Sequence, residues 1–323
     1  MTKDGVSSHF DGSEKRPVTS LATEQVNPAT LEIDRLSPLE MVKVINAEDA
    51  RVAEAVGKEA ESIARAIELI TSRLRNGGRL VYMGAGTSGR LGVLDASECP
   101  PTFTISPELV IGWVAGGTEA IASAYEDIED SFEAGLADAA QLGSHGGLTA
   151  LDVVVGITAS GRTPYTLGAL TYAHSQGTAT IGLANNRPAP LEELADIFIA
   201  PIVGPEVLTG STRLKSGTAQ KMVLNLLSTG SMILLGKTYG NLMVDVQATN
   251  YKLQRRASKA IQLVAGVDQE QADRLLQAAG GETKTAIVMA RSQVSPEEAR
   301  QRLAVHDQNL RNTLESIGSY PET

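Results

Sequence analysis

The chain has 323 residues, with 28 lysines and arginines against 38 acidic residues and a formal net charge of −10. This acidic balance argues against a protein that grips a nucleic-acid backbone or an anionic membrane. Hydrophobic residues make up 42% of the chain, enough for a sizeable core, and the single cysteine, Cys99, excludes an intramolecular disulfide and fits a reducing cytoplasm. The four histidines are scattered, so the sequence predicts no metal site.

The first 75 residues divide into a tail and a helical region. Residues 1–17 are polar and lack the apolar run of a signal peptide, so we expect a flexible tail and a cytoplasmic protein. From Pro38 to Arg75, apolar side chains recur every three or four residues, which predicts helix. Asn76-Gly77-Gly78 then ends it.

Short apolar runs alternate with helical segments over the next 125 or so residues. Their spacing is typical of βα units, and it predicts a five-stranded parallel sheet with helices on both faces and right-handed connections. The expected strands are Arg79–Met83, Leu109–Val114, Leu151–Ile157, Thr178–Leu183 and Ile197–Pro201.

The hydrophobic pattern changes near the end of the chain. Beyond residue 250 only helical periodicity is found, with Gly280-Gly281 ending one helix and the capping sequence Ser295-Pro296 opening another. We therefore predict a tail over residues 1–17, an α/β domain over 18–250 and a small helical subdomain over 251–323.

The first chemical signal is a glycine-rich loop directly after the first expected strand. Gly84, Gly86 and Gly89 fit the dinucleotide fingerprint, but the next strand, Leu109–Val114, ends without the acid that would hold a ribose. The adjacent hydroxyls of Thr87-Ser88 at a helix start instead suit a phosphate monoester. The alternative is a tight glycine turn with an ordinary helix cap.

A second loop of the same kind follows the expected strand Leu151–Ile157. Ser160, Gly161 and Thr163 precede Pro164, which is a plausible first helical residue, and the two hydroxyls can point at an anion. Alone, such a loop is more often a capped turn. Two hydroxyl-glycine loops at the carboxyl ends of parallel strands are less easily explained by chance, because ligands bind there in open α/β sheets.

A third polar run, Gly204–Lys221, leads into the apolar stretch Met222–Gly236. Its glycines, its hydroxyls (among them Ser211) and its two lysines favour a ligand-binding loop. The stretch that follows falls short of the roughly 20 apolar residues that span a bilayer, and we expect a helix of the core or of a subunit interface.

Two acidic segments are candidates for catalysis. Glu98 lies among small and apolar neighbours before Pro100-Pro101, where partial desolvation would favour the protonated form and a role as general acid. The run Tyr125–Ser131 contains several acids and is, by itself, typical of a solvated helix face. Spacing alone does not distinguish Glu129 within it.

Together these segments resemble the N-acetylmuramic acid 6-phosphate etherases, bacterial enzymes of cell-wall sugar recycling built on the SIS (sugar isomerase) fold. The resemblance extends from about Leu21 to the C-terminal helices, while residues 1–17 fall outside it. The run Gly204–Lys221 is also shared with the animal glucokinase regulatory proteins. The matching blocks are Thr23-Glu24 with Asn27, Gly84–Phe103, Ala115-Gly116-Gly117, Glu129-Asp130-Ser131, Ser160–Tyr165 and Gly204–Lys221.

The resemblance implies an SIS-type αβα sandwich and a carbon–oxygen lyase without metal or organic cofactor. It implies that N-acetylmuramic acid 6-phosphate and water give N-acetylglucosamine 6-phosphate and D-lactate by elimination and then hydration. It matches Glu98 to the acid, Glu129 to a second catalytic carboxylate, and Thr87, Ser88, Ser160 and Thr163 to the phosphate loops. Together with the loop pattern, the expected substrate-binding residues are Gly86, Thr87, Ser88, Gly89, Ser160, Gly161, Thr163 and Ser211.

Two other functions compete with this one. One is a non-catalytic sugar-phosphate sensor of the glucokinase regulatory type, but such proteins are about twice as long and have two SIS domains, whereas this chain holds one. The presence of Glu98 before Pro100-Pro101 also favours the enzyme. An aldose–ketose isomerase of the same fold would also abstract a proton at C2 but expel nothing. We expect a homodimer, as in SIS relatives, and neither a nucleic-acid nor a membrane partner. Which carboxylate takes the C2 proton stays open.

Overall fold

The computed structural model describes residues 21–123, 127–142, 147–246 and 251–318. The predicted tail, residues 1–17, lies outside these ranges, as do Tyr125 and Glu126 of the acidic run. No helix among the described residues is long and apolar enough to cross a membrane.

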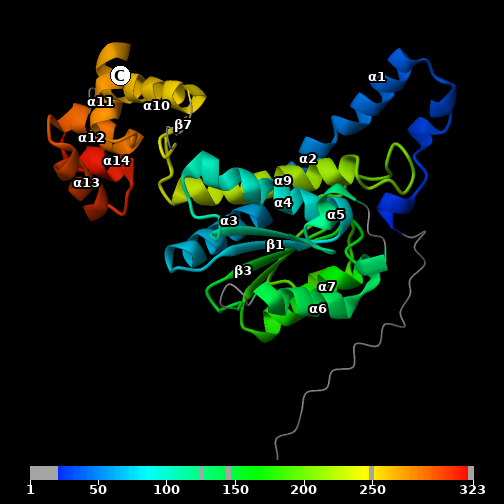
Figure 1. The fold of residues 1–323 in the computed structure, drawn as a ribbon. Helices are drawn as coiled ribbons and strands as arrows, with labels where there is room; N and C mark the ends of the chain where they lie inside the picture. Colours follow the sequence, from blue (N-terminus) through cyan, green and yellow to red (C-terminus); the bar gives the residue numbers. More distant parts are fainter. Residues whose placement is uncertain (1–20, 124–126, 143–146, 247–250, 319–323) are drawn as a thin grey trace, which may run out of the picture.

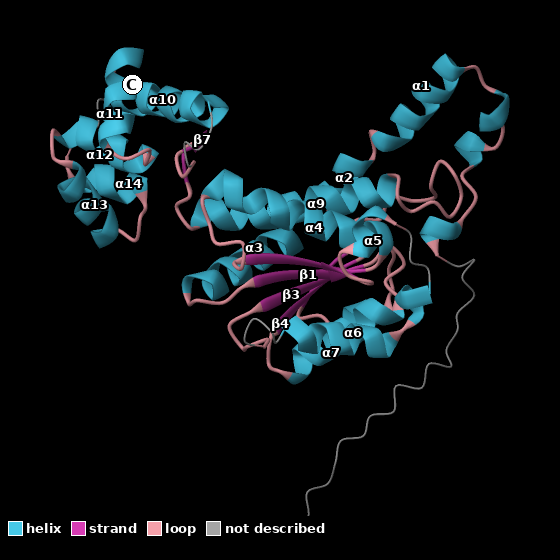
Figure 2. Ribbon diagram, in the orientation of Figure 1, coloured by secondary structure: helices cyan, strands magenta, loops and turns pink. Residues whose placement is uncertain are grey.

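A five-stranded parallel sheet forms the centre of the molecule, as predicted (Figure 2). The strand order is β2-β1-β3-β4-β5, and Leu80 of β1 pairs with Val110 on one side and Val153 on the other. Strand β1 is as long as predicted but shifted by one residue, and the other four strands are shorter than the sequence predicts. The strands are β1 (Leu80–Gly84), β2 (Val110–Val114), β3 (Val153–Ile157), β4 (Ala179–Leu183) and β5 (Ile197–Ile199).

Helices cover both faces of this sheet (Figures 1 and 2). On one face lie α3 (Ala60–Arg75), α4 (Gly86–Phe103) and α9 (Lys215–Leu234); on the other lie α6 (Phe132–Gln141) and α7 (Pro164–Ser175). Alternation along β1 supplies both cores, because Leu80 and Tyr82 pack with the first group of helices and Val81 and Met83 with the second. The predicted αβα sandwich is therefore confirmed.

The N-terminal helical region differs from the single helix that the periodicity predicts. It is broken into α1 (Pro38–Asp49), α2 (Val52–Gly57) and α3, and Figure 1 shows α1 standing away from the sandwich. The reason lies in the packing: α2 and α3 bury an apolar stripe, whereas Glu48 is the only buried residue of α1. Helix α3 ends before Asn76-Gly77-Gly78, as predicted.

The short elements mostly connect the larger ones. The described residues contain two short helices and four 3-10 turns: α5 (Glu119–Ala122), α8 (Pro190–Glu193), η2 (Ala22–Glu24), η3 (Pro28–Thr30), η4 (Ile33–Arg35) and η5 (Asp127–Asp130). A small hairpin that the sequence did not predict, β6 (Thr238–Tyr239) with β7 (Leu242–Met243), follows α9.

The C-terminal helices form a core of their own, which includes Ile261, Leu276, Ile287 and Leu303. Ser295 caps its helix as predicted, accepting a hydrogen bond from the Glu298 N–H. Two of the helices, α12 and α14, were not predicted. The set is α10 (Tyr251–Ala265), α11 (Gln269–Ala278), α12 (Thr283–Ser292), α13 (Pro296–Val305) and α14 (Leu310–Ser316).

The glycine loop after β1 is required by how closely α4 packs on the sheet. A Cβ on Gly89 would lie 2.2 Å from the carbonyl oxygen of Gly84, and a Cβ on Gly84 would lie 2.7 Å from that of Ile157. Neither position has room for a side chain. Gly86 has a φ of +52°, in the left-handed region that glycine adopts without strain.

Candidate functional site

The loop after β1 presents a helix start without a side-chain cap. The N-cap of α4 is Ala85, which has no capping side chain, so backbone N–H groups of the first turn are available to an anion. Thr87 is partly exposed beside them, whereas Ser88 is buried. Gly217 of α9 closes the loop on one side, because a Cβ there would lie 3.5 Å from the Thr87 methyl group.

The loop after β3 gathers three hydroxyls. The Thr158 hydroxyl lies 2.7 Å from that of Thr163 and 3.3 Å from that of Ser160, and Ser160 also accepts a hydrogen bond from the Arg162 N–H. Thr163 is the N-cap of α7, yet its side chain caps no helical N–H. Gly161 has a φ of +72°, which permits the tight turn. This helix start also keeps its donors free for a ligand.

The sheet brings these two loops together. Strands β1 and β3 are hydrogen-bonded neighbours, with Gly84 paired to Ile157 at the carboxyl end of each strand. The starts of α4 and α7 therefore meet at one edge of the sheet, where two positive dipole ends and several hydroxyls converge. This arrangement can bind one phosphate group.

A buried polar relay that the sequence did not indicate holds Ser88. The Ser88 hydroxyl donates to Gln220 of α9 at 2.9 Å, Gln220 donates to Asn185 at 3.1 Å, and Asn185 donates to the Pro201 carbonyl at 3.0 Å. Because a carbonyl can only accept, the relay runs in one direction, and the Ser88 proton points toward Gln220. The relay links the first turn of α4, the loop after β4 and the beginning of α9.

The two candidate carboxylates lie in different settings. Glu98 lies on an exposed side of α4, so this chain alone does not supply the desolvation that the sequence predicts for it. Glu129 is exposed in the 3-10 turn η5, which packs against α7, the helix that starts at the Ser160–Thr163 loop. Glu129 thus lies on a turn that packs against the helix starting at this edge, while Glu98 lies about three turns along α4 from the start of that helix.

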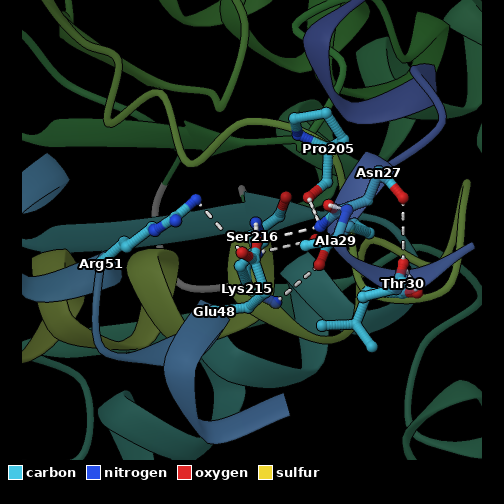
Figure 3. Close-up of polar contacts among 10 residues, drawn as sticks. Asn27, Ala29, Thr30, Glu48, Arg51, Pro205, Lys215 and Ser216 are labelled. Atoms are coloured by element: carbon cyan, nitrogen blue, oxygen red, sulfur yellow. Dashed lines mark hydrogen bonds and ion pairs between the residues drawn. The ribbon is translucent and has the colours of Figure 1, made fainter. Parts of the chain in front are cut away.

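The third polar run holds the start of α9 through a buried ion pair (Figure 3). Lys215 donates to Glu48 at 2.7 Å, and both side chains are almost inaccessible, 1% and 4% exposed. Asn27 donates to the same Glu48 carboxylate at 2.9 Å and to the Pro205 carbonyl at 3.3 Å. The predicted ligand residue Ser211 lies in the turn before the helix, partly exposed.

A second buried carboxylate caps the same helix. Glu206 accepts hydrogen bonds from the N–H groups of Lys215 and Ser216, both at 2.9 Å. An anion at a helix start is favourable, and it offsets the cost of placing Lys215 there. Burial of the Glu48 carboxyl would raise its pKa, but hydrogen bonds from Lys215 and Asn27 and the charge of Lys215 outweigh burial and lower the pKa.

The remaining reactive side chains of the described residues do not form a site. Cys99 is buried, and burial together with the charge of Asp95 raises the pKa of its thiol to about 12, which leaves it unreactive near neutral pH. No group of three or more histidine, cysteine, aspartate or glutamate side chains within the described ranges is arranged to hold a metal ion.

Comparisons with known proteins identify an SIS domain in this chain. Residues 62–174 match the family described as the glucokinase regulatory protein N-terminal SIS domain, and residues 129–230 match the SIS domain. Among solved structures, the phosphoheptose isomerase of Neisseria gonorrhoeae superposes with a TM-score of 0.46 at 21% identity, covering 60% of this chain and 98% of its own.

Curated relatives match over nearly the whole chain. The N-acetylmuramic acid 6-phosphate etherase of Rhodopirellula baltica is 54% identical, covering 92% of this chain and 97% of its own length. That of Serratia proteamaculans is 52% identical, covering 91% of this chain and 98% of its own.

Proposed function

This chain belongs to the N-acetylmuramic acid 6-phosphate etherase family and is an etherase of that sugar phosphate, and we propose that it works through two carboxylates and two phosphate-binding loops. The observation that carries the proposal is the meeting of two uncapped helix starts and a hydroxyl cluster at the edge between β1 and β3. The runner-up, a sugar-phosphate sensor, is not favoured, because the etherases match over almost their full length.

The reaction we propose begins with the open-chain sugar. Its aldehyde at C1 acidifies the proton on C2, a carboxylate removes that proton, and the C3–O bond breaks to release D-lactate. Water then adds across the double bond, its oxygen to C3 and a proton to C2, and gives N-acetylglucosamine 6-phosphate. Because the lactate alkoxide is a poor leaving group, a carboxyl that donates a proton to it contributes about 10²–10⁴-fold.

We assign the acid role to Glu98 and the ionised role to Glu129. Family resemblance matches Glu98 to the leaving-group acid. Glu129 lies in η5 beside α7, close to the edge where the phosphate loops meet, and it takes the C2 proton or assists ring opening. Two carboxyl groups kept in opposite protonation states are the general arrangement for such acid–base work.

The first expected result is release of D-lactate from N-acetylmuramic acid 6-phosphate without added metal, measured with a D-lactate dehydrogenase assay. Conversion of an aldose phosphate to its ketose, with no lactate formed, would instead support an isomerase. Loss of activity in EDTA that zinc or magnesium restores would contradict the proposed metal-free reaction.

A second prediction concerns the phosphate. We propose that it is held by the hydroxyls of Thr87, Ser160 and Thr163, by Ser88 through its backbone N–H, since the Ser88 hydroxyl donates to Gln220, and by the other N–H groups of the two helix starts. Ser160→Ala should remove one hydrogen bond to a charged group, about 1.5–3 kcal/mol, and raise KM about 10- to 150-fold. Thr171→Val is the control, since the Thr171 hydroxyl donates to the Leu167 carbonyl within α7. Equal turnover of unphosphorylated N-acetylmuramic acid would contradict the assignment.

A third prediction is that the enzyme is a cytoplasmic homodimer, in which α9 and the N-terminal helices contribute to the contact. Large apolar side chains are exposed on these elements: Leu39 and Val42 of α1 are 65% and 63% exposed, and Leu226 and Ile233 of α9 are 44% and 48% exposed. Light scattering should therefore give twice the chain mass of 34.0 kDa. A fully active monomer at micromolar concentration would exclude the dimer.

A further inference from the structure

Residues 21–30, here called the N-terminal strap, are held against the loops that follow the sheet. The Asn27 amide donates to the Pro205 carbonyl at 3.3 Å (Figure 3). The Thr30 hydroxyl donates to the Val207 carbonyl at 2.9 Å. Each of these side chains would lose a hydrogen bond if the strap moved away, so the strap has a fixed position.

One buried amide fastens the strap to the phosphate-binding loop after β3. The side-chain amide of Asn186, in the loop after β4, donates to the Thr23 hydroxyl at 3.0 Å and to the Ala159 carbonyl at 2.9 Å. Both Thr23 and Asn186 are almost inaccessible, 0% and 2% exposed. Because Ala159 directly precedes Ser160, the strap lies next to one of the expected phosphate-binding hydroxyls.

The next residue of the strap, Glu24, reaches toward the other phosphate-binding loop. A Cβ on Gly210, in the turn before α9, would lie 3.3 Å from Glu24 Oε2. The same turn extends to the loop after β1, because a Cβ on Gly217 would lie 3.6 Å from the Thr212 carbonyl oxygen and 3.5 Å from the Thr87 methyl group. The Glu24 carboxylate is therefore linked by short contacts to both loops.

This carboxylate is available to a ligand. Glu24 is the only ionisable side chain of the strap, and it is partly exposed. Within the described ranges, no group forms an ion pair or a hydrogen bond with the carboxylate. The phosphate and the lactyl carboxylate of the substrate are both anionic and would be repelled. A neutral donor, a hydroxyl or an amide N–H, is the kind of substrate group that Glu24 can bind.

The neutral donor closest to the phosphate is the C5 hydroxyl of the open-chain sugar. Four bonds join the phosphorus to this oxygen, a separation of at most about 6 Å, and the C4 hydroxyl and the acetamido nitrogen are farther along the chain. In the closed ring the same oxygen is an ether without a proton. Ring opening breaks the C1–O5 bond, the C1 hydroxyl loses its proton, and O5 gains one. A carboxylate at this place therefore distinguishes the open chain from the ring.

We propose that Glu24 accepts a hydrogen bond from the C5 hydroxyl and thereby selects the open-chain form of the substrate. The inference rests on the proposed function, in which the phosphate occupies both loops and the reaction begins from the aldehyde. An interaction that only the open chain makes raises the fraction of bound sugar with an acidic C2 proton. The proton transfers of the elimination stay with Glu98 and Glu129.

Two unreactive analogues separate the open chain from the ring. N-Acetylmuramitol 6-phosphate is always open and carries the C5 hydroxyl, whereas the 1,5-anhydro sugar is always closed. Neither has an aldehyde, so calorimetry can measure the Kd of each without turnover. Glu24→Ala should weaken binding of the open analogue about 10- to 150-fold, because a hydrogen bond to a charged group is lost. Binding of the ring analogue should stay within about twofold of the wild type, because its ether oxygen donates nothing.

Two further variants complete the test, with circular dichroism and Tm as checks of the fold. Gln25→Ala, at the next and exposed position of the strap, should leave both Kd values unchanged. Glu24→Gln keeps an uncharged acceptor, so its Kd for the open analogue should lie between those of the wild type and Glu24→Ala.

The possible failures are distinguishable. Equal weakening of both analogues by Glu24→Ala would overturn the assignment to the C5 hydroxyl, and unchanged binding of both would overturn any contact with the sugar. In either case D-lactate release by the wild type would leave the proposed function intact. A wild-type protein that binds neither analogue and releases no D-lactate would overturn the proposed function and this inference with it.

Discussion

Glu98→Gln should abolish D-lactate release while the enzyme still exchanges the C2 hydrogen of the substrate for deuterium. Without the acid, C2 deprotonation remains possible but the lactate alkoxide cannot leave, and we expect turnover to fall about 10²–10⁴-fold. Glu129→Gln should lose exchange and elimination together, because the C2 carbanion no longer forms. Proton NMR of the substrate in deuterated water, followed by a D-lactate assay on the same samples, measures both steps.

The control for this experiment is Glu133→Gln, an exposed acid in the first turn of α6 with no assigned part in the reaction. It should match the wild type in both measurements. If exchange survived in Glu129→Gln and disappeared in Glu98→Gln, the two roles would have to be interchanged.

Lys215→Met should destabilise the protein by about 3–5 kcal/mol, because the buried Glu48 carboxylate loses its buried cation and keeps only Asn27 and the exposed Arg51 as partners. Urea unfolding followed by circular dichroism measures the loss. The matched control is Lys58→Met, which breaks an exposed pair with Glu54 and should change the free energy of unfolding by less than about 0.5 kcal/mol. A similar small change in both variants would contradict a stabilising role for the buried pair.

The same pair makes stability depend on pH. The pKa of Glu48 is lowered in the folded protein, so its contribution is fully present above the unfolded value, about 4.3, and is lost as pH falls through the folded value. Glu48→Gln in the Lys215→Met background removes both charges and should recover part of the lost stability. It should also flatten the fall in the free energy of unfolding below about pH 4.3.

The parallel sheet was predictable because four of its five strands, all but β2, are buried along their whole length. Such strands are rich in apolar residues, and a run such as Val153–Ile157 is recognisable without any tertiary information. The break between α1 and α2 was not predictable in the same way. It lies next to Glu48, whose buried partner Lys215 is 167 residues away, and no local sequence pattern indicates that contact.

The candidate site was also predictable only where its residues are close together in the sequence. Glycines and hydroxyls after β1 and β3 mark the two loops because each loop is built from consecutive residues. Gln220 and Asn185 were missed, since glutamine and asparagine are ordinary within a helix or after a strand until the fold brings them to Ser88. The predicted desolvation of Glu98 failed for one chain because neighbours in sequence do not determine which side of a helix faces solvent.

The absence of room at Gly84 and Gly89 affects how distant relatives of this protein can be recognised. Because a side chain at either position would collide with backbone oxygens, these glycines are needed for α4 to rest on the sheet whether or not a ligand ever binds. A newly sequenced chain can therefore keep the glycine motif after losing its chemistry. Sorting genomes by that motif would group chains by architecture, and only the acidic positions would separate enzymes from catalytically silent descendants.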